Sequence, residues 1–141
     1  MSSIVLVGNS ANILGRGFGS KIDEFDEVVR FNNFKLKGYE HDVGTKTTIW
    51  FQNSSWVQAT DEQKNLEAKV ILQSVEHPNG SAVESLYFTY PSVPYYVIAE
   101  VRQIVPRSQY NLSTGIQAIA WMCRLYKTVH CIGFDFWKTR D

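Results

Sequence analysis

The chain has 141 residues, a length typical of one compact domain with a buried core. Its 14 basic and 14 acidic side chains give a formal net charge of zero and form no long run of one sign, which argues against a nucleic-acid partner. The sequence begins without a leader-like segment and contains no apolar run near the ~20 residues of a membrane span. We therefore expect a chain without a membrane segment, located in the cytoplasm.

Six apolar segments are predicted to be strands. Residues 4–7 are a continuous apolar run, which is typical of a strand buried on both faces of a parallel sheet. The later strands are predicted at residues 27–32, 47–51, 68–73, 95–99 and 129–136, and the last of these is also expected to be buried. Residues 76–92, rich in Pro, Gly, Ser and aromatic side chains, are expected to be irregular.

Helices are predicted between several of these strands. Ser20 is the expected cap of a short helix with Asp23 and Glu24 in its first turn, and Thr60 is the expected cap of another. Residues 116–126 form an amphipathic helix whose predicted apolar face consists of Ile116, Ile119, Ala120 and Cys123. The alternation of strands and helices predicts an α/β fold: a single domain over residues 1–141 with a mainly parallel sheet.

The two cysteines are interpreted as buried thiols. Cys123 falls in the predicted helix and Cys131 in the next strand. Neither lies in a C-x-x-C pair or in a Cys/His spacing typical of a metal site, so no metal is expected.

Uncharged polar residues follow the predicted strands at the edge where ligands bind to such sheets. The candidates are Asn9 and Ser10 after the first strand, Asn32 and Asn33 after the second, Gln52 and Asn53 after the third, and Ser113, Thr114 and Gly115 at a helix start. Such groups suit a sugar, a nucleobase and a monoanionic phosphate, and a helix N-terminus favours an anion. Each one alone is an ordinary loop residue or cap, so it is their occurrence together that favours a binding site.

Other nucleotide and catalytic motifs do not fit. Gly15, Gly17 and Gly19 form G-x-G-x-G instead of G-x-G-x-x-G, and Asn32 stands where a Rossmann oxidoreductase needs an acid. The sequence contains no P-loop and no G-x-S-x-G. His130 is expected to be structural and His41 to lie in a polar loop, which leaves His77 as the one histidine to test as a general base.

Two long segments resemble the sialyltransferase family. Residues 7–48, which begin V-G-N-S and include R-F-N-N and D-V-G-T-K-T-T, resemble the long donor-binding sialylmotif of the eukaryotic-type enzymes. Residues 111–134, with S-T-G, an apolar helix and a closing G-F, resemble the short sialylmotif. Asn53 and the stretch G-F-D-F at residues 133–136 are also similar to the bacterial sialyltransferases.

The resemblance implies a modified Rossmann-type glycosyltransferase. Such an enzyme transfers a sialic acid or a related nonulosonate from its cytidine monophosphate (CMP) donor to a sugar hydroxyl of a glycan acceptor, with inversion and without a metal or other cofactor. A CMP-linked 3-deoxy-octulosonate is an alternative donor. The resemblance makes Asn9, Ser10, Asn32, Asn53 and the Ser113-Thr114-Gly115 segment the donor-binding residues.

Two departures from the family pattern leave an alternative open. The cysteines that form a disulfide in the animal enzymes correspond here to Ser2 or Ser3 and to Tyr126, which agrees with a reducing compartment. The family's general-base histidine lies beyond the short motif, and this sequence ends at Asp141. The alternative to a transferase is therefore a non-catalytic remnant that binds CMP or a sugar nucleotide.

Overall fold

The computed structural model describes residues 2–53, 63, 68–73, 95–98 and 114–135. Six strands lie within these ranges: β1 (Ile4–Val7), β2 (Glu27–Phe31), β3 (Ile49–Asn53), β4 (Lys69–Gln73), β5 (Tyr95–Ile98) and β6 (His130–Ile132). They form one sheet in the order β5-β4-β3-β2-β1-β6, and all five neighbouring pairs are parallel. The predicted α/β fold with a parallel sheet is confirmed.

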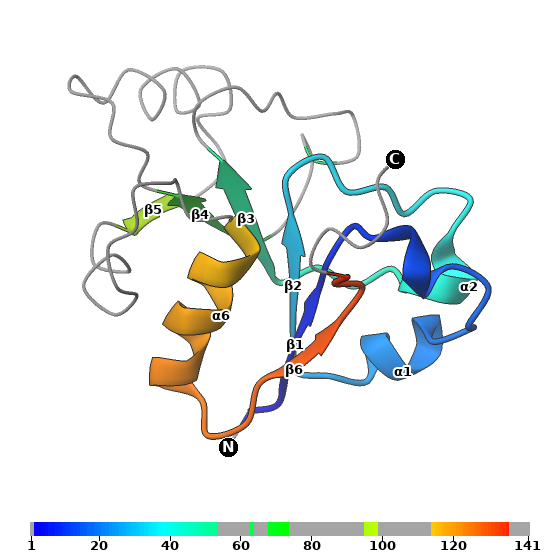
Figure 1. The fold of residues 1–141 in the computed structure, drawn as a ribbon, viewed down its shortest axis with the longest axis horizontal. Helices are drawn as coiled ribbons and strands as arrows, with labels where there is room; N and C mark the ends of the chain where they lie inside the picture. The colour runs from blue at the N-terminus through cyan, green and yellow to red at the C-terminus, as the bar shows by residue number, and fades with distance from the viewer. Residues whose placement is uncertain (1, 54–62, 64–67, 74–94, 99–113, 136–141) are drawn as a thin grey trace.

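The strand order changes direction at β1. From β1 the chain adds strands outward to β5, and β6 then pairs with the opposite side of β1 (Figure 1). In open parallel sheets, ligands bind beyond the carboxyl ends of the strands at such a switch point. The topology therefore predicts a ligand site at the loops that follow β1 and β6.

The helices cover both faces of the sheet. The described part contains a 3-10 helix η1 (Ala11–Ile13), α1 (Gly19–Asp23), α2 (Glu40–Val43) and α6 (Thr114–Leu125). Helix α6 lies on one face, and α1 and α2 lie on the other (Figure 1). None of the helices within the described ranges is long and apolar enough to cross a membrane.

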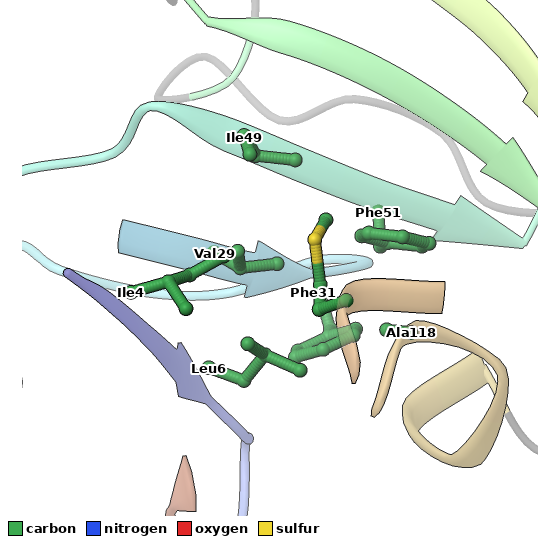
Figure 2. Packing of buried hydrophobic residues seen from close by; sticks show 8 residues of the cluster. Ile4, Leu6, Val29, Phe31, Ile49, Phe51 and Ala118 are labelled. Atoms are coloured by element: carbon green, nitrogen blue, oxygen red, sulfur yellow. The ribbon is translucent and has the colours of Figure 1, made fainter. Parts of the chain in front are cut away.

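Two apolar clusters sandwich the central strands. In β1, Ile4 and Leu6 face α6, whereas Val5 and Val7 face α1 and α2, because successive side chains of a strand point to opposite faces. Figure 2 shows the first cluster, which consists of Ile4, Leu6, Val29, Phe31, Ile49, Phe51, Ala118 and Met122. The prediction that β1 is buried on both faces is confirmed, since all four of its residues are at most 3% exposed.

The prediction for the first helix is wrong at its N-terminus. Helix α1 begins at Gly19 with Phe18 in the N-cap position, so Asp23 closes the helix and does not lie in its first turn. The Asp23 carboxylate accepts hydrogen bonds from the backbone N–H groups of Thr45 and Lys46, each at 2.9 Å. This acid therefore anchors a later loop. His41, expected in a loop, is part of the short helix α2.

The strand predicted over residues 129–136 is present as β6, but its predicted length and its burial are wrong. Strand β6 is only three residues long, and His130 and Cys131 are exposed. Within the described sheet β6 is an edge strand that pairs with β1 alone, so less of it is covered. Both cysteines are exposed thiols, contrary to the prediction.

Helix α6 buries a face displaced by one residue from the predicted one. Ala118 and Met122 are buried and Ile119 packs beside them, whereas Cys123 points outward. Apolar residues fill most of this helix, so a 3.6-residue period fits the sequence in more than one phase. Only the contact with the sheet selects the phase.

The other boundaries agree with the predictions to within two residues, with β3 ending at Asn53 instead of before it. Of the helix expected to begin at Thr60, the structure describes only Gln63, which is helical, and the irregular stretch at residues 76–92 lies outside the described residues.

Leucine truncations test the core directly. Leu6 is fully buried, whereas Leu125 at the end of α6 is 61% exposed. We expect Leu6→Ala to lower the free energy of unfolding by about 2–5 kcal/mol, because it leaves a cavity between β1 and α6. The same substitution at Leu125 is the matched control and should change it by less than about 0.5 kcal/mol. Urea unfolding of both variants measures the difference, and equal losses would contradict the described core.

Candidate functional site

The loops that follow β1 and β6 are joined backbone to backbone. Gly8 N–H donates to the Ile132 carbonyl at 2.8 Å, and Ser10 N–H donates to the Gly133 carbonyl at 2.9 Å. A Cβ atom built on Gly8 would collide with the carbonyl oxygen of Gly133 and lie 2.9 Å from the Phe134 ring. Only glycine at residue 8 permits this approach. The two segments that resemble sialylmotifs, residues 7–48 and 111–134, therefore meet at this junction.

Phe134 connects this junction to the start of α6. Its ring packs edge-on against Phe31 at the end of β2, with ring centroids 5.6 Å apart. A Cβ on Gly115 would lie 3.0 Å from the same ring, so the first turn of α6 sits close to Phe134. The backbone of the predicted helix-start segment, Thr114 and Gly115, is thereby brought to the carboxyl edge of the sheet. Ser113 and His77 lie outside the described residues.

Asn9 bridges the ends of β1 and β2. Its Nδ2 donates to the Phe31 carbonyl at 2.9 Å, which fixes the orientation of the amide. The Oδ1 atom accepts no hydrogen bond from the residues that the structure describes, and the side chain is exposed. Asn9 therefore presents an oriented acceptor at the sheet edge.

Ser10 has a local structural role. Its Oγ accepts a hydrogen bond from Asn12 N–H at 3.3 Å and caps the helix η1. The Nδ2 atom of Asn12 in turn donates to the Phe134 carbonyl at 3.2 Å, a third link between the two loops. The hydroxyl of Ser10 thus helps to shape the loop whether or not it also contacts a ligand.

Asn32 holds the turn after β2 in a left-handed conformation, with φ of 49°. Its N–H donates to the Phe51 carbonyl at 2.8 Å, and its carbonyl accepts from Trp50 Nε1 at 2.8 Å. Asn tolerates this conformation better than most residues. Asn32 and the β3 terminus at Asn53 lie at the predicted edge by their backbones, since β1, β2 and β3 are parallel.

A cavity of about 300 Å³ opens beside these residues. It lies between the loop after β1 and the loop after β2, and its lining consists of Val7, Gly8, Asn9, Ser10, Ala11, Ile13, Leu14, Arg30, Asn33, Phe34, Lys35, Tyr39 and Val43. Of the polar residues predicted at this edge, Asn9, Ser10 and Asn33 line it. Asn32 is not part of the lining.

Arg30 also lines the cavity, and it was not among the predicted site residues. Its side chain is 1% exposed, and burial lowers the pKa of the guanidinium to about 10, although Asp23 acts in the opposite direction. It therefore remains protonated at neutral pH. An arginine between two valines and a phenylalanine in a predicted buried strand is the sequence signal that identifies such a group.

The glycines at residues 15, 17 and 19 lie outside the cavity lining. Gly15 and Gly17 adopt positive φ, and Gly17 N–H donates to Asp42 Oδ1 at 2.8 Å. Backbone hydrogen bonds from Gly15 and Gly17 lower the pKa of the Asp42 carboxyl. These contacts tie the loop before α1 to α2 and do not line the cavity.

The two described histidines do not lie in the cavity lining. His130 begins β6 and packs edge-on against Phe25, with centroids 5.0 Å apart. The ring of His41 lies against Gly17. Within the described residues no group of His, Cys, Asp and Glu side chains is arranged to hold a metal ion.

Replacing Gly8 tests the junction between the two loops. We expect Gly8→Ala to separate them and to accelerate amide exchange at Ser10, whose N–H donates to Gly133, beyond the loss of global stability. Gly15→Ala is the control, since a Cβ there meets nothing within 4 Å and adds only backbone strain. Hydrogen exchange followed by NMR compares the variants, and unchanged relative protection of Ser10 in Gly8→Ala would refute the junction.

Comparisons with known proteins agree with this arrangement. Residues 2–86 match the family model described as glycosyltransferase family 29 (sialyltransferase). A human CMP-N-acetylneuraminate-β-1,4-galactoside α-2,3-sialyltransferase is 35% identical over 68 residues, which are 48% of this chain and 18% of that protein. A β-1,6-galactosyltransferase of Arabidopsis thaliana is 43% identical over 53 residues, 38% of this chain and 13% of that protein.

A solved structure has the same fold. A mammalian sialyltransferase crystallised with Gal-beta-1-3GalNAc-ortho-nitrophenol superimposes with a TM-score of 0.71 at 25% identity, covering 94% of this chain and 55% of that one. The chain thus spans little more than half of the solved relative, and its matches cover about a fifth or less of the two curated relatives described above. With more than half of its residues matched by the family model, the chain belongs to glycosyltransferase family 29, the sialyltransferases.

Proposed function

We propose that this chain binds a CMP-activated sugar and forms the donor-binding part of a sialyltransferase-type glycosyltransferase. The transferred group is a sialic acid or a related nonulosonate, and the acceptor is a sugar hydroxyl of a glycan. The observation that carries the proposal is the junction of Gly8 with Gly133 in a family 29 chain, beside a cavity that Asn9 and Ser10 line.

The polarity of the edge supports a nucleoside monophosphate as the leaving group. Asn9 offers an oriented amide oxygen, and the first turn of α6 lies near the same junction through Gly115 and Phe134. A helix N-terminus carries a partial positive charge that stabilises an anion. A single phosphate needs less compensation than a diphosphate, so we propose transfer with inversion and without a metal ion.

The names of the relatives differ in the sugar that is transferred, so the identity of the donor sugar has to be tested. The human relative carries a sialyltransferase name, and the Arabidopsis thaliana relative carries a galactosyltransferase name. The crystallised relative holds a galactosyl disaccharide, which suggests a galactose-terminated acceptor. We favour the CMP-linked nonulosonate, and a uridine diphosphate galactose donor is the comparison.

Binding without transfer is the second candidate. Neither of the two described histidines, His41 and His130, lines the cavity. No described histidine is therefore placed to accept the proton of the acceptor hydroxyl. General-base catalysis contributes about 10² to 10⁴ in rate, so its loss would leave a donor-binding module. The cytoplasmic location and the role of His77 stay predictions.

Calorimetric titration tests donor binding. We expect CMP to bind more tightly than uridine or adenosine monophosphate, and Asn9→Ala to weaken CMP binding about tenfold through the loss of an oriented hydrogen-bonding group. Ser20→Ala is the control: Ser20 is exposed in α1, does not line the cavity and takes no part in the junction of the two loops. Urea unfolding verifies that both variants fold. Equal affinity for the three nucleotides would refute the proposal.

A transfer assay separates the two candidates. The chain is incubated with CMP-N-acetylneuraminate or uridine diphosphate galactose and a galactose-terminated acceptor, and product is followed by mass spectrometry. Product from the CMP donor supports the transferase, and CMP binding without product supports the binding module. Product from the uridine donor alone would contradict the proposed donor class.

A further inference from the structure

The cavity beside Asn9 carries positive charge. Its lining contains two basic side chains, Arg30 and Lys35, and no acidic one. The chain as a whole has equal numbers of basic and acidic residues, so this surface departs from the average. Lys35 is exposed and screened by solvent, whereas Arg30 is 1% exposed and acts in a medium of low dielectric constant.

Uncharged acceptors hold the Arg30 guanidinium in place. Nε donates to the Lys46 carbonyl and to Thr47 Oγ1, each at 3.0 Å. Nη2 donates to the carbonyls of Val43 at 2.8 Å and Lys46 at 2.9 Å. These bonds fix the position of the charge and connect β2 to the loop that precedes β3, but they do not neutralise it.

No carboxylate among the described residues forms an ion pair with Arg30. Asp23 influences it at longer range, and the Asp23 carboxylate is itself engaged by the backbone of Thr45 and Lys46. Nη1 of Arg30 has no hydrogen-bond acceptor within the described part of the chain. A buried charge is costly unless an opposite charge compensates it.

We propose that Arg30 gives the cavity its preference for an anionic ligand group, either a phosphate or a carboxylate. The Arg30 charge acts as a positioning group: it draws the anionic oxygen toward Asn9 and Ser10, while those residues make the contacts. The identification of that group with the phosphate or the sugar carboxylate of a CMP-linked nonulosonate rests on the proposed function. A purely structural Arg30 would hold the loop at residues 43–47 and have no effect on ligand charge.

Charged and neutral ligand pairs test the preference. The phosphate pair is CMP and cytidine, and the carboxylate pair is N-acetylneuraminate and its methyl ester. In the native chain we expect the charged member of at least one pair to bind about 10- to 100-fold more tightly, the range of a charge-assisted interaction. The pair that shows the difference identifies the source of the anion. Native affinities that are equal within both pairs would overturn the proposal.

Three variants separate the charge from the structural role. Arg30→Gln removes the charge and should abolish the preference, whereas Arg30→Lys retains a positive charge and should restore most of it. Thr47→Val removes one acceptor of Arg30 but no charge, so it should leave the preference unchanged. A folded Arg30→Gln variant with the native preference would overturn the proposal. Failure of the proposed function is a separate outcome: CMP then binds no better than adenosine monophosphate, whatever the Arg30 variants do.

A measurement on the native chain decides the matter if Arg30→Gln does not fold. The guanidinium ¹⁵N resonance of Arg30 is assigned by its loss in Arg30→Lys. It should move with the charged member of the responsive pair and stay in place with the neutral member. A resonance that responds equally to both members would contradict the electrostatic role.

Discussion

The close backbone approach of Gly8 to Gly133 is the constraint on which the site depends. It brings the loop after β1 against the loop after β6 at the point where the strand order changes direction. Two hydrogen bonds from the first loop to the second fix their register, and Phe134 extends the contact to Phe31 and to the start of α6. Segments more than a hundred residues apart in the sequence thus form one surface, which two separate motifs in the sequence had indicated.

Much of this arrangement was predictable because periodicity and topology carry it. The continuous apolar run at residues 4–7 predicted a strand covered on both faces, and the two clusters around β1 confirm it. Parallel strands place their carboxyl ends at one edge, so the positions of Asn9 and Asn32 followed from the strand predictions. The spacing of Gly15, Gly17 and Gly19 did not fit a dinucleotide loop, and none of the three lines the cavity.

The remainder depends on contacts that a linear pattern does not specify. Helix α6 is apolar on most of its surface, so the sequence does not show which face is buried. Cys123 was therefore wrongly predicted to be buried. The prediction that Cys131 is buried was wrong because the burial of a strand depends on its place in the sheet, and β6 lies at an edge of the described sheet. Arg30 was missed because its four hydrogen bonds go to groups 13 to 17 residues away, mostly backbone carbonyls that look the same in every sequence.

The central claim is that CMP binds in the cavity beside the junction of the loops after β1 and β6. Amide chemical-shift mapping of the ¹⁵N-labelled chain with CMP tests it most directly. The largest shifts should fall on the loop after β1, around Asn9 and Ser10, and on the loop after β2, around Asn33, with smaller ones at Gly133, and all should saturate with a single affinity. Shifts confined to the opposite edge of the sheet, around Ser3 and Asp26, or no shifts at millimolar CMP, would contradict the account.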